Sequence, residues 1–86
     1  MPEVSRFFGI VIRMYFDDHN PPHFHAFYGE SEAQFGIEPI GLLCGALPNR
    51  AISMVLEWAA LHQQELTRNW ERLHDEQAVQ RIAPLQ

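Results

Sequence analysis

The sequence predicts an α+β fold in which a small antiparallel sheet of three to four strands packs one face against one long C-terminal helix. Two observations predict it. Up to residue 45, short alternating segments are separated by Gly and Pro, as in strands and turns; from residue 49, apolar residues recur every three or four positions, as on a helix. The 86 residues suit one domain, with a sheet over 1–46, a helix over 48–76 and an extended tail over 77–86.

The first strand is expected over residues 7–16, where side chains alternate with a period of two. One face carries Ile10, Ile12, Met14 and Phe16, and the other carries Val11, Arg13 and Tyr15. Because both faces bear large side chains, we interpret this segment as an interior strand. Residues 17–22 (DDHNPP) follow as a stiff connection, since consecutive prolines fix their φ angles and exclude helix.

The second strand is expected over residues 23–28, and a turn at 29–31 leads into a third strand at 32–38. In the second strand the alternation opposes Phe24, Ala26 and Tyr28 to His23, His25 and Phe27. In the third it opposes Ala33, Phe35 and Ile37 to Glu32, Gln34 and Glu38. Pro39 and Gly41 mark another turn, and residues 41–45 form a short fourth strand.

One unbroken helix is expected from residue 49 to about residue 75, with Pro48 and Asn49 suited to its start. Its apolar stripe consists of Ile52, Val55, Ala59, His62, Leu66, Trp70 and Leu73. Such a helix is about 40 Å long, roughly twice the length of the strands, so its far end should overhang the sheet. The tail is read as extended, with Ile82 and Leu85 as anchors.

The apolar sector of this helix is wider than one sheet contact requires. The residues expected to form an interface are Met54, Trp58 and Leu61 beside the main stripe, and Trp70 and Leu73 on the overhanging turns. Exposed aromatic patches usually mark interfaces, so we expect a protein partner or a homodimer. The alternative is that the tail folds back over the last two of these residues.

Charge argues against nucleic acid as the partner. The net charge is −5, and all six basic residues are arginines scattered along the chain, whereas phosphate binding needs a basic stripe. Folding could still gather two or three of them. We also expect no membrane span and a cytoplasmic location, because no apolar run approaches about 20 residues and the N-terminus does not resemble a signal peptide. The single Cys44 agrees with a reducing compartment.

Three of the five histidines, His19, His23 and His25, fall within the segment DHNPPHFHA. On a strand the last two point to one side with origins about 6.5 to 7 Å apart, close enough to bind one divalent transition metal such as zinc. The rigid turn could bring His19, Asp17 or Asp18 to the same point. Because metal sites usually need three or four ligands, we favour hydrogen-bonded sheet imidazoles with no cofactor over a metal site.

Alternation directs His23 and His25 away from the helix, onto a face shared with Arg13 and Tyr15. On that face a metal-independent ribonuclease is conceivable, with the two imidazoles as base and acid, Arg13 stabilising the phosphorane and Tyr15 positioning the substrate. The acidic balance of the chain opposes this hypothesis. The simplest alternative is that Arg13 pairs with Glu32 or Glu38 across the sheet, a contact worth about 0 to 1 kcal/mol if exposed.

The segments SRFFGIVIRMYFDDHNPPHFHAFYGE, RAISMVLEWAALHQQEL after LP, NWE and IAPL resemble a widespread prokaryotic family of domains of unknown function. The matching positions are Arg13, Tyr15, His19, Pro21, Pro22, His23, His25, Tyr28, Gly29 and Glu30, followed by Leu56, Glu57 and Trp58 in the helix. Members are often encoded beside a second small uncharacterised protein. The resemblance therefore implies one component of a two-gene regulatory or toxin–antitoxin-like module, and it implies no particular activity.

Two hypotheses follow. The leading one is an interaction domain that acts through a protein partner or as a homodimer. The alternative is a histidine-centred site on the open sheet face, which either binds metal or cleaves RNA.

Overall fold

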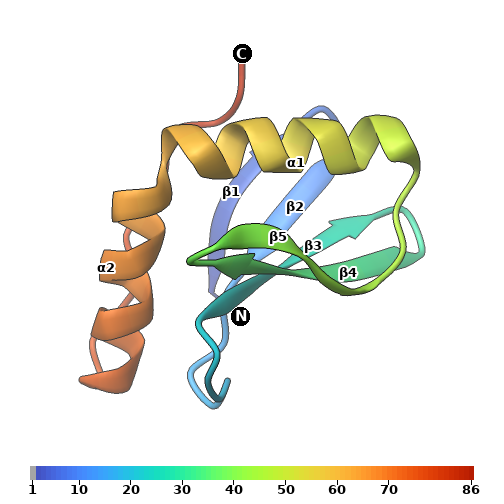
Figure 1. The fold of residues 1–86 in the computed structure, drawn as a ribbon. Coiled ribbons are helices and arrows are strands. Elements are labelled where there is room, and N and C mark those ends of the chain that lie inside the picture. Colours follow the sequence, from blue (N-terminus) through green and yellow to red (C-terminus); the bar gives the residue numbers. More distant parts are fainter. Residues whose placement is uncertain (1) are drawn as a thin grey trace.

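The computed structural model describes residues 2–86 as a five-stranded sheet with two helices (Figure 1). The elements are β1 (Glu3–Phe7), β2 (Ile10–Arg13), β3 (His23–Tyr28), β4 (Ser31–Ile37), β5 (Ile40–Gly45), α1 (Asn49–Leu61) and α2 (Gln63–His74). The strands lie in chain order, and every neighbouring pair is antiparallel. The predicted α+β class with an antiparallel sheet is confirmed, whereas the prediction of three to four strands and a single helix is wrong.

The first predicted strand, over residues 7–16, is not continuous: it contains the end of β1, the turn of a hairpin and β2. Phe8 and Gly9 have φ angles of 50° and 81°, so the chain reverses in a two-residue turn with both residues in the left-handed region. β1 therefore runs back along β2 and forms one edge of the sheet. The core side chains of β2, Ile10 and Ile12, are fully buried as expected, but Phe16 lies beyond the strand and is 60% exposed.

The remaining strands lie close to their predicted positions. β3 coincides with the predicted segment 23–28, and β4 and β5 begin within a residue of their predicted starts. Phe24 pairs with Phe35 across β3 and β4, and their rings stack with centroids 5.5 Å apart. Trp58 of α1 contacts Phe24 from above, with ring centroids 5.7 Å apart. α1 therefore covers one face of the sheet, and the core lies between them.

The long helix breaks at His62, whose φ and ψ angles are −124° and 26°. α1 lies across the sheet, and α2 turns sharply and runs down past the strand ends (Figure 1). The side-chain amide of Gln63 donates a hydrogen bond to the carbonyl oxygen of Ile37 at 2.8 Å, which fixes the start of α2 at the end of β4. A straight helix would leave Leu66 and Trp70 without cover; the bend buries both.

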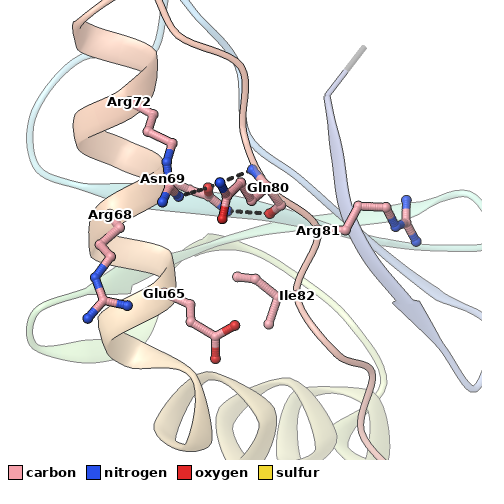
Figure 2. Close-up of a pocket in the computed structure, with 7 residues that line it drawn as sticks. All are labelled: Glu65, Arg68, Asn69, Arg72, Gln80, Arg81 and Ile82. Atoms are coloured by element: carbon pink, nitrogen blue, oxygen red, sulfur yellow. Dashed lines mark hydrogen bonds between the residues drawn. The ribbon is translucent and has the colours of Figure 1, made fainter.

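The tail is held against α2 by the buried side chain of Asn69 (Figure 2). Its Nδ2 donates to the Gln80 carbonyl at 2.8 Å, and its Oδ1 accepts from the Gln80 backbone N–H at 2.9 Å. Arg72 donates to the same Oδ1 at 2.9 Å. One side chain thus satisfies both backbone groups of a residue in a segment with no regular structure.

The tail then returns along β1. The backbone N–H of Ile82 donates to the Val4 carbonyl at 2.9 Å, and the indole N–H of Trp58 donates to the Ala83 carbonyl at 2.9 Å. Ile82 is 4% exposed, so it anchors the tail as predicted. The β1 edge of the sheet is therefore covered by the chain itself.

These contacts bury several helix residues that we expected to be exposed at an interface. Trp58, Trp70 and Leu73 are buried in the chain, so the expectation that they form an exposed interface is wrong for these three residues. The bend at His62 and the returning tail cover them. Leu61 is 67% exposed and Met54 is half-buried, so both remain on the surface.

Candidate metal centre

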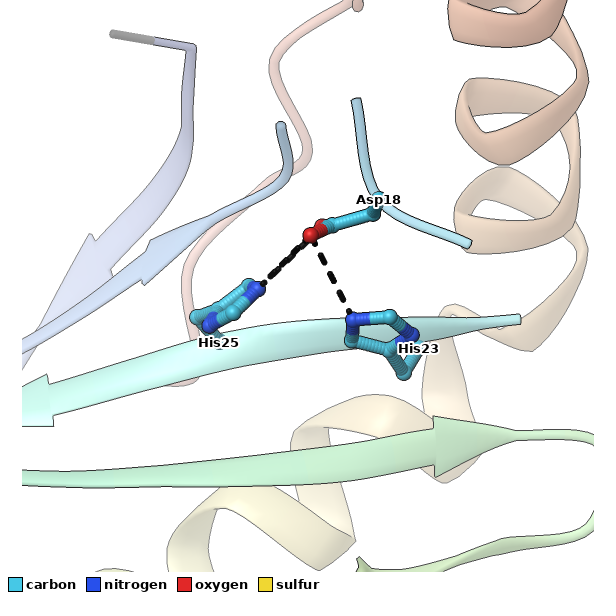
Figure 3. A group of neighbouring side chains, drawn as sticks. All are labelled: Asp18, His23 and His25. Carbon is cyan, nitrogen blue, oxygen red and sulfur yellow. Dashed lines mark hydrogen bonds and ion pairs between the residues drawn. The ribbon is translucent and has the colours of Figure 1, made fainter. Parts of the chain in front are cut away.

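His23 and His25 lie on the face of β3 opposite α1, because their neighbour Phe24 points into the core beneath Trp58. Neither ring is open to solvent: His23 is 8% exposed and His25 is 7% exposed. The connection that precedes β3 folds over them and places Asp18 above the strand (Figure 3). The two imidazoles thus occupy a small polar enclosure on the second face of the sheet.

A tight turn positions Asp18. Its backbone N–H donates to the Tyr15 carbonyl at 3.2 Å, and its Oδ2 accepts from the Tyr15 backbone N–H at 3.2 Å. This reciprocal pair holds the carboxylate over β3. The Asp18 side chain is only 14% exposed.

The carboxylate meets the Nε2 atoms of both histidines (Figure 3). His25 Nε2 lies 3.1 Å from Asp18 Oδ2 and 3.3 Å from Oδ1. His23 Nε2 lies 3.5 Å from Oδ1. The three residues each offer a ligand atom, and these atoms lie within 4.8 Å of one another. Two imidazoles and one carboxylate therefore converge on one point.

The other ring nitrogens are already engaged. His23 Nδ1 lies 2.8 Å from the Pro21 carbonyl oxygen, and His25 Nδ1 lies 3.3 Å from a carboxylate oxygen of Glu32. Carbonyl and carboxylate oxygens only accept, so a neutral His23 that donates its Nδ1–H to Pro21 presents the Nε2 lone pair toward Asp18. Both ring nitrogens of His25 face carboxylates, and a neutral ring can donate to only one of them. A cation between Asp18 and the two Nε2 atoms would let both rings donate from Nδ1.

Aromatic side chains surround this group. Tyr15 packs edge-on against His25 with ring centroids 4.7 Å apart, and Trp70 of α2 lies 5.4 Å from His23. The bend between the helices thus contributes a wall of the enclosure. Apolar walls reduce the access of water to a site and strengthen electrostatic interactions inside it.

Arg13 takes no part in the group. Its guanidinium lies over the Phe27 ring, 5.2 Å from the centroid, and within residues 2–86 it forms no ion pair with Glu32 or Glu38. Its Nε is buried and has no hydrogen-bond partner among the described residues. The alternative of a cross-strand ion pair is therefore wrong, and Glu32 contacts His25 instead.

His19 is exposed and lies outside the group, so its expected role as a third ligand is wrong. Asp18, another residue of the same connection, is the third member of the group instead. No sequence pattern indicates the contacts of Pro21 and Glu32 with the two imidazole rings, because each contact depends on how the chain returns across β3. A base-and-acid role for His23 and His25 has little geometric support, since both Nε2 atoms already face the same carboxylate.

Folding does gather arginines beside the tail. Arg68, Arg72 and Arg81 line a cavity of about 40 Å³ together with Glu65 (Figure 2). Arg81 turns away from this cavity and bonds Glu3 at 3.0 Å. Hydrogen bonds from Arg6 and Arg81 lower the pKa of the Glu3 carboxyl from 4.5 to about 2. Arg72 and Arg81 are thus engaged within the chain rather than arrayed as a phosphate-binding stripe.

The fold and the site define a small α+β domain with a two-histidine, one-carboxylate cluster enclosed on the sheet face opposite its first helix. The chain belongs to a family described as a domain of unknown function (DUF4160), whose model matches residues 9–71. That range includes the whole cluster and most of both helices. No curated protein and no solved structure matches the chain significantly. Neither helix in the described part of the chain has the length and apolar character to cross a membrane.

Proposed function

We propose that this domain binds one divalent transition-metal ion through Asp18, His23 and His25. The observation that supports the proposal is the convergence of two Nε2 atoms and one carboxylate on one point, while both Nδ1 atoms lie within hydrogen-bond distance of other oxygens. Metal ligands have to be deprotonated, and the Nδ1 contacts with Pro21 and Glu32 suit the tautomer of each ring whose Nε2 can coordinate. Side-chain exposures of 10%, 9% and 14% mean that an unpaired carboxylate here would be costly.

The spacing of the ligands suits a tetrahedral ion. Zinc lies about 2.0 to 2.1 Å from its nitrogen and oxygen ligands, which separates neighbouring ligands by about 3.3 Å. The shortest distance from each histidine to Asp18, 3.1 Å for His25 and 3.5 Å for His23, lies on either side of that value. Small shifts of the rings would complete the coordination.

The donor set selects the class of metal. Two imidazole nitrogens and one carboxylate oxygen suit zinc, ferrous iron and related ions, whereas calcium and magnesium prefer oxygen ligands. The carboxylate of Glu32 behind His25 and the Pro21 carbonyl behind His23 resemble the partners that usually orient metal-bound histidines. Three protein ligands leave a position for water or a substrate, as in catalytic rather than closed zinc sites.

Calorimetric titration of chelator-treated protein with zinc tests the proposal, and cobalt(II) absorption reports the geometry. We expect one ion per chain, with affinity reduced at least about tenfold in His23→Ala, His25→Ala and Asp18→Ala. His19→Ala is the matched control, because His19 is exposed in the same connection, and it should bind normally. Absence of zinc binding in the unmodified protein would contradict the proposal, as would an equal loss in the control.

Protein interaction is a second function, favoured by large apolar side chains on the surface. Among residues 2–86, six such side chains are exposed by 39% to 67%, namely Phe8, Phe16, Tyr28, Leu42, Leu43 and Leu61. We propose that the domain acts through a protein partner or as a homodimer. The resemblance suggests a small neighbour-encoded protein as that partner, as in a two-gene regulatory or toxin–antitoxin-like module. A strictly monomeric protein at micromolar concentration that co-purifies with no neighbour-encoded protein would count against this role.

A further inference from the structure

The tip of the β1–β2 hairpin carries a residue that the turn does not favour. Phe8 has a φ angle of 50°, in the left-handed region that bulky residues rarely adopt. Two-residue turns of this kind favour Asn, Asp or Gly at that position. The Phe8 side chain is also 61% exposed, so it buries little apolar area in return. An exposed aromatic residue in an unfavourable backbone conformation points to a role other than folding.

Phe8 lines a groove between the hairpin tip and the start of α1. The groove has a volume of about 420 Å³, and its lining residues are Phe8, Tyr28, Pro48, Arg50, Ala51 and Met54. This volume lies within the range of about 300 to 1,000 Å³ typical of ligand sites. Tyr28 is 39% exposed, and its ring lies so close to Gly9 that a Cβ there would be 3.3 Å from Tyr28 Cε1. The glycine therefore lets the tyrosine ring form part of the groove.

Arg50 provides the charge in the groove. Within residues 2–86 no carboxylate pairs with Arg50, and the first turn of α1 contains no acidic residue and no capping side chain. The free amide groups of that turn add to the positive potential. Arg50 therefore places an unpaired positive charge at this end of α1. A ligand that complements it carries a negative charge.

The side chains that line the groove are those that dominate protein interfaces. Aromatic residues, Met and Arg are enriched at interface cores, and the flexible Met54 side chain can adapt to different shapes. A second copy of the chain fits poorly, because a twofold contact through this groove would oppose one Arg50 to the other. Carboxylates that would balance them do not line the groove.

We propose that the groove formed by Phe8, Tyr28, Arg50 and Met54 binds a short segment of a partner protein that presents a large apolar side chain beside an Asp or Glu. The apolar side chain would lie between Phe8 and Met54, and the carboxylate would pair with Arg50. This inference deepens the interaction role proposed above and is independent of the metal centre. It moves the expected interface from the buried tryptophans to the hairpin tip.

A displayed library of random peptides of about 12 residues, selected on the intact protein, tests the proposal. We expect the enriched peptides to share an acidic residue adjacent to Leu, Phe or Trp. Binding of the best synthetic peptide is then measured by fluorescence polarisation. Arg50→Glu and Phe8→Asn should each weaken it about tenfold or more. Replacing the acidic residue of the peptide by its amide should do the same, whereas the control Leu61→Gln, at a residue outside the groove, should not.

Phe8→Asn distinguishes binding from folding. Asn suits the left-handed turn position, so the melting temperature should stay constant or rise while peptide binding is lost. Failure to enrich acidic–apolar peptides would overturn the proposal, as would equal binding by Phe8→Asn or a melting temperature that falls in that variant. Self-association abolished by Phe8→Asn would assign the groove to a second copy instead. A neighbour-encoded protein that still binds both groove variants would overturn the groove assignment and leave the interaction role intact.

Discussion

Replacement of Asp18 by Asn should stabilise the metal-free protein and abolish metal binding. The introduced amide nitrogen can take the position of Oδ1, which lies 3.3 Å from His25 Nε2 and 3.5 Å from His23 Nε2. The amide oxygen keeps the hydrogen bond from the Tyr15 N–H, now 3.2 Å long. If both rings carry their hydrogen on Nδ1, as metal binding through Nε2 requires, the two amide N–H groups can donate to the two Nε2 lone pairs. The Asp18 carboxylate, which only accepts, cannot form these hydrogen bonds.

The magnitude follows from the number of new hydrogen bonds. Each neutral hydrogen bond contributes a net 0.5 to 1.5 kcal/mol, so two contribute about 1 to 3 kcal/mol. With an unfolding entropy of about 2.1 cal/mol/K per residue, the melting temperature of an 86-residue chain should rise by about 5 to 15 °C. If the cluster instead holds a protonated histidine paired with Asp18, removing the charge breaks a buried ion pair. Stability should then fall by about 3 to 5 kcal/mol.

Thermal unfolding in chelator at about pH 8 shows directly whether Asp18→Asn raises or lowers the melting temperature. Asp17→Asn is the matched control, because it removes the same charge from an exposed neighbour and should leave the melting temperature nearly unchanged. Added zinc should stabilise the unmodified protein and not Asp18→Asn; an ion at 100 times its Kd adds about 2.7 kcal/mol. A melting temperature that falls in Asp18→Asn would refute the assignment of both ring hydrogens to Nδ1.

Three further predictions concern the fold. Hydrogen bonds from Arg6 and Arg81 lower the pKa of the Glu3 carboxyl from 4.5 to about 2. The ionised Glu3 side chain therefore stabilises the fold above pH 4.5, and this stabilisation is lost as the pH falls toward 2. Thermal melts over that range should therefore depend less on pH in Glu3→Gln than in the unmodified protein, and parallel curves would contradict this. Asn69→Ala removes the hydrogen bonds that hold the tail and should cost about 2 to 3 kcal/mol in urea unfolding; a cost below about 0.5 kcal/mol would mean that the tail is not held there. Gly45→Ala should cost about 2 kcal/mol or more by the same measurement, because Gly45 has a φ of 86° and a Cβ would lie 2.7 Å from a Cα atom of β4; unchanged stability would show that the strand can shift.

Local signals predicted β3, β4 and β5 because Gly and Pro separate their alternating segments. β1 was not predicted, since the chain turns at Phe8 and Gly9 within a continuous apolar run. A turn normally signalled by Asn or Asp is formed here by an aromatic residue, so only Gly9 could have indicated it. Phe8, the residue that made the turn unrecognisable in the sequence, also lines the proposed groove.

The helix break was equally invisible to local patterns. The apolar periodicity continues through His62, and neither Gly nor Pro interrupts it. Tertiary packing decides the break, because Leu66 and Trp70 become buried only if α2 turns down past the sheet. The mismatch between a helix of about 40 Å and strands half as long was the one indication that the helix could not stay straight.

At the site, strand periodicity predicts His23 and His25 on an open sheet face directed away from the helix. They do lie opposite α1, but they are buried, and His23 packs against Trp70 of α2. The third residue of the cluster could not be identified from the sequence. The turn between Tyr15 and Asp18 decides which side chain of DDHNPP reaches the imidazoles. Long-range contacts such as that of His25 with Glu32 depend on strand register, which sequence alone did not supply.

X-ray absorption spectroscopy of the zinc-loaded protein tests the central claim most directly, because it reports the atoms bound to the ion. We predict two imidazole nitrogens and carboxylate or water oxygen at about 2.0 to 2.1 Å, with the imidazole signal reduced by half in His25→Ala. A sulfur ligand at about 2.3 Å, which only Cys44 or a methionine could supply, would contradict the assignment, as would a zinc shell without imidazole.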